Sequence, residues 1–93
     1  MTYQLIERLP SIEEYRALCT AVGWQNVMNF EAAVGSLARS LYGVVVAYEG
    51  QTVGMGRLVG DGFIYFYVQD IAVLPEHQGQ GVGRMIMEGL MHH

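Results

Sequence analysis

The chain has 93 residues, of which 52% are hydrophobic and 15% charged, and its formal net charge is −4. This length predicts one domain over residues 1–93, and the scattering of its five cations argues against nucleic acid as a partner. No segment approaches the roughly 20 uninterrupted apolar residues of a membrane span and no signal-peptide pattern opens the chain, so we expect a cytoplasmic protein without a membrane partner.

The first half of the chain predicts one strand and two helices. Residues 3–9 alternate well enough for a strand, and Ser11 with Glu14 forms the spacing of a capping box at the start of a helix that runs to residue 22. The single cysteine, Cys19, is expected at a position of that helix that faces the protein core. Residues 23–26 break it, and Asn29 caps a second helix with an apolar stripe that we expect in the core: Phe30, Ala33, Val34, Leu37 and Leu41.

The second half predicts three successive strands. Residues 42–48 and 53–59 form a hairpin around a tight turn at residues 49–51. Residues 60–62 turn the chain into a long apolar strand over residues 63–73. Gly54 and Gly56 alternate in the hairpin, which predicts a close backbone approach on one face.

A glycine-rich loop follows the long strand. Residues 78–83 read Gln-Gly-Gln-Gly-Val-Gly, and glycine at every second position leaves backbone N–H groups uncovered by side chains. An amphipathic helix is predicted next, from the helical spacing of Val82, Met85, Ile86, Gly89 and Leu90. The first turn of such a helix has unpaired N–H groups and a partial positive charge, so phosphate or pyrophosphate is the natural ligand. A turn that serves packing alone is the alternative.

Two other nucleotide-binding loops fit this segment less well. A P-loop ends in Lys-Ser/Thr, whereas this run ends in Gly83-Arg84-Met85, which excludes it. The dinucleotide-binding fingerprint needs G-x-G-x-x-G and an acidic residue about 20 positions later, whereas this chain has G-x-G-x-G and only ten further residues.

The strand end and the loop together match a known motif. Residues 70–83 read Asp-Ile-Ala-Val-Leu-Pro-Glu-His-Gln-Gly-Gln-Gly-Val-Gly, and they closely resemble the acetyl-coenzyme A binding motif of the GNAT superfamily of N-acetyltransferases. The predicted order β-α-α-β-β-β-α resembles the first part of the GNAT fold. The resemblance implies an α+β, acyl-CoA N-acyltransferase fold with a mixed, mostly antiparallel sheet and flanking helices.

The family's later strands have no counterpart in these residues. We therefore expect a domain that is incomplete at its C-terminal side, either a fragment of a longer protein or a chain whose sheet is completed by another segment, another chain or a second copy in a homodimer.

The resemblance also implies the cofactor contacts. The pantetheine arm of acetyl-coenzyme A would pair with the backbone of the strand at Ile71, Ala72 and Val73. The pyrophosphate would meet the backbone N–H groups of the loop and helix start, at Gln78, Gly79, Gln80, Gly81, Val82, Gly83 and Arg84. The Arg84 side chain adds a cation or, alternatively, is a solvated partner of Glu88. No metal is expected.

The reaction implied is direct transfer of acetyl from acetyl-coenzyme A to a primary amine of a small molecule, through a tetrahedral intermediate near the backbone of Val73. Catalytic residues stay unassigned. With strict alternation, Tyr65, Tyr67 and Gln69 share a face that has no carboxylate. Asp70 points away from that face unless a bulge intervenes, and we expect it to be an acceptor that anchors the loop.

The acceptor site implied by the resemblance has aromatic walls. Its wall would be formed by Trp24, Asn26 and Phe30, and its floor by Tyr65 and Tyr67. Gln69 would also bind the substrate from the same face as these tyrosines, and core packing is the alternative for the aromatic residues. Two other functions stay open, namely a coenzyme A-binding module without catalysis and a half-domain whose bare strand edge recruits a protein.

Overall fold

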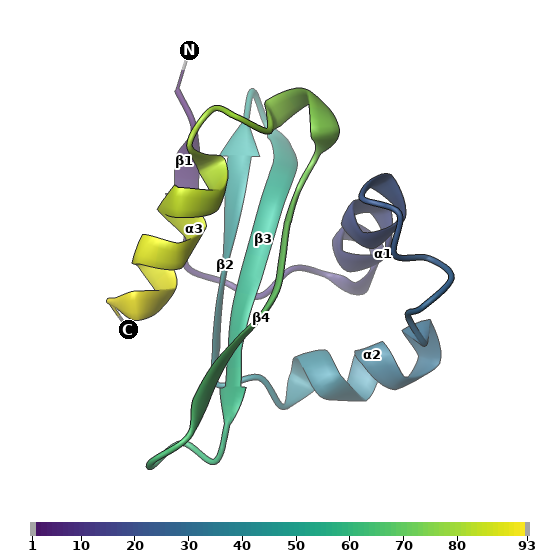
Figure 1. Ribbon diagram of the computed structural model, residues 1–93, viewed down its shortest axis with the longest axis vertical. Helices are drawn as coiled ribbons and strands as arrows, with labels where there is room; N and C mark the ends of the chain where they lie inside the picture. Colours follow the sequence, from purple (N-terminus) through teal and green to yellow (C-terminus); the bar gives the residue numbers. More distant parts are fainter. Residues whose placement is uncertain (1, 93) are drawn as a thin grey trace.

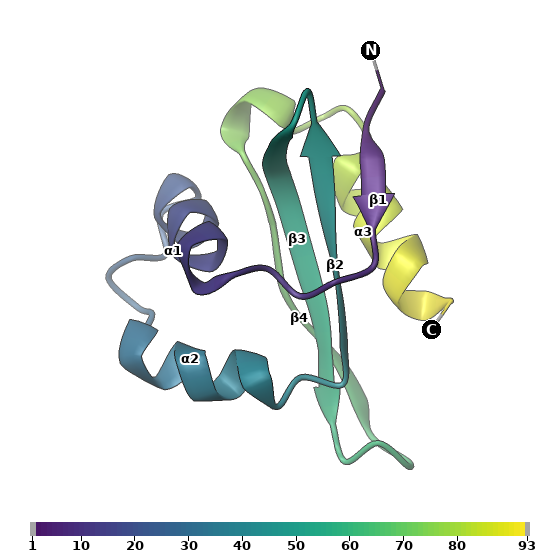
Figure 2. The ribbon, with the colours of Figure 1, turned by 180° about the vertical axis from the view of Figure 1, so that it is seen from behind.

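A computed structural model describes residues 2–92, which form one antiparallel sheet in the order β1-β2-β3-β4. The strands are β1 Gln4–Ile6, β2 Tyr42–Tyr48, β3 Gln51–Gly60 and β4 Phe66–Val73. The helices are α1 Ile12–Ala21, α2 Phe30–Ala38, the 3-10 turn η1 Pro75–His77, and α3 Val82–Met91. Figures 1 and 2 show α3 on one side of the sheet and α1 with α2 on the other. The predicted α+β fold and element order are confirmed.

Helix α1 begins at the predicted capping box. Ser11 Oγ accepts from the N–H of Glu14 at 3.1 Å, and the Glu14 carboxylate accepts from the N–H of Ser11 at 2.8 Å. Arg8 donates twice to the same carboxylate, at 2.8 and 2.9 Å, and the hydroxyl of Thr52 donates to it from β3. These hydrogen bonds, those from Arg8 foremost, lower the pKa of Glu14 to about 2.

Helix α2 begins where predicted, since the side chain of Asn29 accepts from the N–H groups of Glu31 and Ala32. The predicted stripe is only partly right. Ala33 and Leu37 are buried, but Val34 is 56% exposed because it lies on the side of α2 that faces away from the core. The helix ends at Ala38, before Leu41.

The close approach predicted for the hairpin is confirmed on the α3 face. A Cβ at Gly56 would lie 2.5 Å from Cγ2 of Ile86, so only glycine lets α3 come this near to β3. The core between them is entirely apolar: Val44, Val46, Val53, Leu58, Val73, Val82, Ile86 and Leu90. The close contact at Gly56 therefore sets the distance between α3 and the sheet. Within the described residues, no helix is both long and apolar enough to cross a membrane.

Two predicted strands are shorter than expected. Strand β1 ends at Ile6, where the N–H of Arg8 donates to the carbonyl of Ile6 at 3.0 Å and turns the chain away. Strand β4 begins at Phe66 instead of residue 63, because the Asp61 carboxylate accepts from the N–H groups of residues 63–65. These hydrogen bonds also lower the pKa of Asp61. They hold residues 63–65 in a turn outside the ladder.

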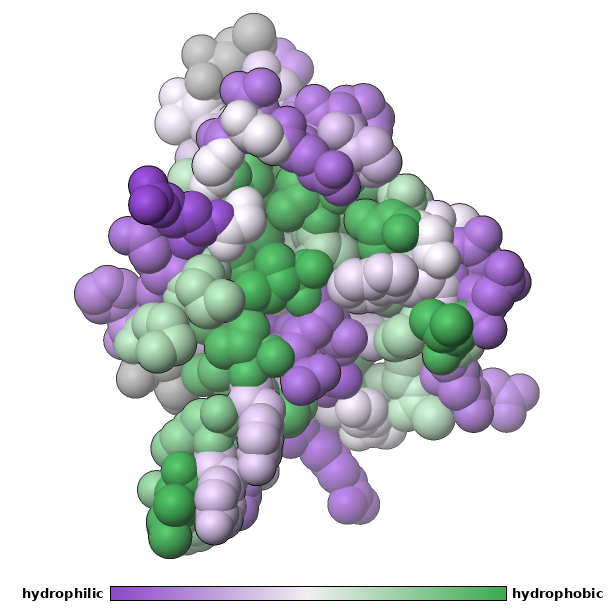
Figure 3. Space-filling view, in the orientation of Figure 1, coloured by the Kyte–Doolittle hydropathy of each residue, from purple (hydrophilic) through white to green (hydrophobic). Residues whose placement is uncertain are grey.

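This turn between β3 and β4 is strongly apolar and faces solvent. Phe63 is 88% and Ile64 76% exposed. The β3–β4 end of the sheet extends beyond the helices, and Figure 3 shows hydrophobic residues gathered on the lobe that projects there.

Candidate functional site

The glycine loop connects η1 to α3 and leaves backbone donors unpaired. Gly81 is the N-cap of α3, with φ of 85°, and no side chain caps the helix. The first helical hydrogen bond runs from the N–H of Met85 to the carbonyl of Gly81, at 3.0 Å. The N–H groups of Val82, Gly83 and Arg84 therefore precede the intrahelical ladder and lie at the positive end of the helix dipole.

The space in front of these donors is open. A Cβ built at Gly79, Gly81 or Gly83 would meet no other heavy atom within 4 Å. Gln80 and Arg84 are exposed, and no ion pair joins Arg84 to Glu88 in the structure. The loop can therefore receive an anion through its backbone, with Arg84 near enough in the chain to add a positive charge.

Gln78 connects the start of the loop to strand β4. Its Nε2 donates to the carbonyl of Val73 at 3.0 Å, which ties the loop to the end of β4. Its own N–H donates to the carbonyl of Pro75 at 3.3 Å, so this group is engaged within η1 and is not free for a pyrophosphate as the sequence led us to expect. The unpaired donors begin after Gln78.

Two tyrosines contact His77 in η1, just before the glycine loop. The hydroxyl of Tyr3 lies 2.9 Å from Nδ1 of His77, the last residue of η1. The ring of Tyr48 lies 4.8 Å from that of Tyr3 and 5.1 Å from that of His77. The sequence carried no signal for this cluster, because Tyr3 and His77 are 74 positions apart in the chain.

Strand β4 is an edge strand, so one row of its backbone groups has no neighbouring strand. The N–H of Leu74 donates to the carbonyl of Val53 at 2.9 Å. Since backbone groups alternate in direction along a strand, those of Ala72 and Leu74 point to β3 and those of Val73 point to the free edge. The carbonyl of Val73 accepts there from Gln78.

A bulge interrupts β4 just before this point. Met55 pairs with Ala72 and Arg57 with Gln69, so two residues of β4, Asp70 and Ile71, lie opposite Gly56 alone. Asp70 has a φ of 58°. Strict alternation thus fails from Asp70 onward, and the bulge that the sequence left open is present. Without the extra residue, the Asp70 carboxylate would point into the apolar core beneath α3.

The bulge turns Asp70 toward α1 and α2, into a buried polar network. Asp70 Oδ2 accepts from Nε of Arg57 at 2.6 Å and from the hydroxyl of Tyr15 at 2.9 Å. Arg57 is 8% exposed, and its Nη1 also donates to the carbonyl of Ser36 and to Oγ of Ser40. Burial, followed by the hydrogen bond to Asp70, raises the pKa of Tyr15 above its ordinary value. Asp70 is thus an acceptor, but it binds Tyr15 and Arg57 and does not anchor the loop as predicted, and it lies on the face from which strict alternation would have turned it away.

The residues predicted for the acceptor site lie on this same side of the sheet without forming one wall. Trp24 and Phe30 are partly buried and pack on the core beneath α1 and α2. The rings of Tyr65 and Tyr67 stack at 6.5 Å and are more than half exposed, and Gln69 is exposed opposite Arg57.

A cavity of about 220 Å³ opens nearby, lined by other residues: Tyr15, Met28, Asn29, Ala32, Ala33, Ser36 and Arg57. It lies between the helices and the buried network. The acceptor roles of the predicted residues stay predictions.

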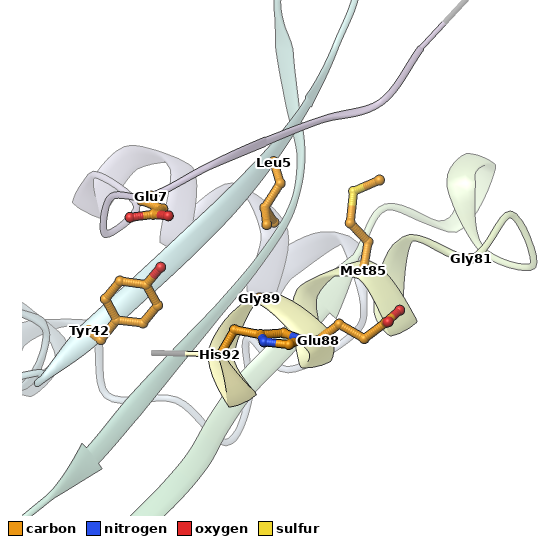
Figure 4. Close-up of a pocket in the computed structure, with 8 residues that line it drawn as sticks. All are labelled: Leu5, Glu7, Tyr42, Gly81, Met85, Glu88, Gly89 and His92. Carbon is orange, nitrogen blue, oxygen red and sulfur yellow. The ribbon is translucent and has the colours of Figure 1, made fainter.

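A second cavity, of about 530 Å³, lies beside α3 on the β1 side (Figure 4). The carboxylates of Glu7 and Glu88 line it, and it reaches the glycine loop only at Gly81. These negative charges disfavour a diphosphate there. Residues 2–92 contain no group of three or more His, Cys, Asp or Glu side chains that could hold a metal ion. Burial raises the pKa of the Cys19 thiol, which makes it a poor nucleophile.

Comparison with known structures gives strong matches over nearly the whole chain. A Staphylococcus aureus protein of unknown function, described as a probable acetyltransferase, is 36% identical, with a TM-score of 0.87 over 98% of this chain and 68% of its own. A GNAT family acetyltransferase from Elizabethkingia anophelis, solved with acetyl-CoA bound, is 18% identical and shares the fold, with a TM-score of 0.71 over 97% of this chain and 56% of its own.

Sequence comparison points to the same family. A curated Gibberella zeae protein assigned by name as an acetyltransferase is 42% identical over 40 residues, which are 43% of this chain and 23% of that protein. The chain thus spans about a quarter of this curated relative. The model of the acetyltransferase (GNAT) domain matches residues 40–93, which include the hairpin, the bulged strand and the glycine loop. The chain therefore belongs to the GNAT family of acetyltransferases.

Proposed function

We propose that the protein transfers an acetyl group from acetyl-CoA to a primary amine of a small molecule. Membership of the GNAT acetyltransferase family supports acetyl transfer, and the Elizabethkingia anophelis relative was solved with acetyl-CoA bound. In the proposed reaction the thioester supplies the acetyl group, which passes to the neutral amine through a tetrahedral intermediate while coenzyme A leaves as the thiol.

The single observation that carries this proposal is the open row of unpaired N–H groups at the start of α3. Gly79, Gly81 and Gly83 leave room for a ligand to approach the backbone. We assign the diphosphate of the cofactor to the N–H groups from Gly79 to Arg84, through Gln80, Gly81, Val82 and Gly83. Gln78 then acts through its side chain, which fastens the loop to β4.

The pantetheine arm is assigned to the free edge of β4. An amide-bearing chain can pair there with backbone groups without needing particular side chains. The geometry at Leu74 supports Val73 as the residue whose N–H faces the edge, which also makes that N–H the candidate donor to the developing oxyanion. Ile71 belongs to the same edge segment, whereas Ala72 pairs with Met55.

The acceptor amine is assigned to the face of the sheet beneath α1 and α2. The cavity beside Tyr15, Asn29 and Arg57 lies there. The predicted wall of Trp24 and Phe30 and the exposed pair of Tyr65 and Tyr67 flank this side, with Gln69 next to the bulge. Aromatic rings beside polar groups suit a small amine.

The test is calorimetric titration of coenzyme A into the full-length protein and into a matched pair of glycine variants. Gly83→Ala places a methyl group in front of the loop, because Cβ atoms point toward the helix N-terminus. Gly35→Ala makes the same change in α2, where a Cβ also meets nothing within 4 Å. Both variants should gain about 0.5–1 kcal/mol of stability from the higher helix propensity of alanine.

Only Gly83→Ala should weaken coenzyme A binding, by about tenfold. Failure of the unmodified protein to bind coenzyme A at millimolar concentration would refute the cofactor assignment. Equal affinity of the two variants for coenzyme A would refute the assignment of the diphosphate to this loop.

A coenzyme A-binding module without catalysis is the second candidate. The observation that favours it is the engagement of Asp70, whose carboxylate already accepts hydrogen bonds from Arg57 and Tyr15 and is poorly placed to take a proton from an amine. Thiol release on mixing acetyl-CoA with a panel of amines separates the two functions. Release above the rate without amine supports the transferase, and its absence with bound cofactor supports the module.

The expected partners and location stay predictions. The free edge of β4 supports completion of the sheet by another segment, another chain or a second copy. The cytoplasmic location rests on the sequence pattern alone.

A further inference from the structure

A buried charged pair lies directly behind the free edge of β4. The side chains of Arg57 and Asp70 are 10% and 14% exposed, and Nε of Arg57 lies 2.6 Å from Oδ2 of Asp70. The Tyr15 hydroxyl donates to the same carboxylate oxygen from α1. Two further hydrogen bonds anchor Arg57 to the end of α2. The network thus joins both helices to one point of β4.

That point is the bulge. Asp70 adopts a φ of 58°, a conformation that L residues other than Asn and Asp rarely take. Its side chain can reach Arg57 only because Asp70 and Ile71 share the place opposite Gly56. The charge pair therefore requires the bulge.

The bulge decides which backbone groups face the free edge. With an unbroken register after Gln69, Ile71 and Val73 would pair with Met55 and Val53, and the groups of Val73 would point into the sheet. The extra residue shifts this alternation by one. Ala72 instead pairs with Met55, and Leu74 donates to Val53, which leaves the N–H and carbonyl of Val73 directed outward.

We propose that Asp70, Arg57 and Tyr15 are positioning residues that hold the bulge of β4 and thereby direct the backbone of Val73 to the pantetheine arm of coenzyme A. The inference rests on the proposed function for its ligand. None of the three side chains touches coenzyme A in this account. They act through the strand, from the opposite face of the sheet to that covered by α3.

The experiment compares two ligands on the full-length protein. Coenzyme A would reach both the loop and the strand edge, whereas 3′-phospho-ADP lacks the pantetheine arm and would reach the loop alone. The main variant is Asp70→Asn, because asparagine also tolerates positive φ and nearly preserves the shape while removing the charge. Glu13→Gln, on the exposed side of α1, is the matched control.

We expect Asp70→Asn to weaken coenzyme A binding by about tenfold and 3′-phospho-ADP binding by less than about twofold. Tyr15→Phe keeps the charge pair and should weaken coenzyme A alone, by about threefold. If Asp70→Asn does not fold, Tyr15→Phe serves as the test variant. In amide NMR spectra, both variants should shift Ile71 and Val73 and leave Gly79 and Gly81 unchanged.

Equal weakening of both ligands would overturn the proposal, since it would indicate a general loss of stability. Unchanged affinity for both ligands in a folded variant would also overturn it. If the unmodified protein binds neither ligand, the proposed function fails. The proposed role of the three side chains in holding the bulge is then tested by the NMR shifts alone. Absence of these shifts would refute that role.

Discussion

The two faces of the sheet meet their helices through different chemistry. Against α3, the contact is apolar throughout and close enough to require glycine at position 56. Against α1 and α2, an apolar core surrounds the buried pair of Arg57 and Asp70, and Glu14 gathers hydrogen bonds at the rim. The apolar face holds the helix whose first turn carries the glycine loop, so the loop's position depends on packing.

The face that packs against α1 and α2 differs from the apolar one by its buried ion pair, and it is called the polar face below. Burial of an ion pair is rarely the most stabilising choice for a core, because desolvation opposes the attraction between the charges. Here the pair lies at a strand bulge and beside a cavity, where the direction of backbone groups matters more than stability. In the proposed binding of coenzyme A, the face covered by α3 holds the glycine loop and the other face holds the bulge of β4.

The largest effect is expected on the apolar face. Ile86→Ala should lower the free energy of unfolding by about 3–4 kcal/mol, since Ile86 is fully buried between α3 and β3 and its loss leaves a cavity. Urea denaturation measures this. Met87→Ala, on the exposed side of the same helix, should lose less than about 1 kcal/mol. Similar losses in both variants would show that α3 is loosely packed.

The polar face should respond less strongly to loss of its charge. Asp70→Asn should cost about 2 kcal/mol of unfolding free energy, because Arg57 stays buried without its counter-charge while most hydrogen bonds can still form. The same urea denaturation measures it beside Glu13→Gln. A loss below about 0.5 kcal/mol would mean that water already screens the pair.

The start of α1 offers a smaller effect on this same face. Ser11→Ala removes the side chain that accepts from the N–H of Glu14, and we expect a loss of about 1 kcal/mol. Thermal unfolding followed by circular dichroism provides the measurement. An unchanged melting temperature would indicate that the hydrogen bonds from Arg8 and Thr52 to Glu14 are sufficient to hold the helix start.

The smallest expected effect is a pH dependence at Glu14. Its pKa is lowered from 4.5 to about 2 in the folded protein, so its stabilisation is fully present above about pH 4.5 and is lost as the pH falls through about 2. Because Arg8 is largely exposed, we expect only about 0.5 kcal/mol. The stability difference between the unmodified protein and Glu14→Gln should shrink from pH 6 to pH 2.5, and a constant difference would contradict this origin.

The sequence predicted those features that depend on neighbours in the chain. The caps at Ser11 and Asn29 and the turn at Gly50 follow from local spacing, and each is present. The glycine loop was found for the same reason. The start of β4 was misplaced because a side chain, that of Asp61, captures the backbone donors that a strand would have used.

The network behind β4 was missed because it joins distant segments. Tyr15 and Asp70 are 55 positions apart, and no periodicity relates them. A signal was nevertheless present, since Arg57 and Asp70 are charged residues within two otherwise apolar predicted strands. Charges at such positions need partners, and pairing them would have required a bulge.

The contact between Gly89 and Leu5 has a consequence for biosynthesis. A Cβ at Gly89 would lie 2.8 Å from the Leu5 side chain, so α3 rests on β1, which precedes the other strands of the sheet in the chain. The apolar side of the sheet stays bare until α3 has emerged from the exit tunnel. During that interval the nascent chain is a candidate for chaperone capture.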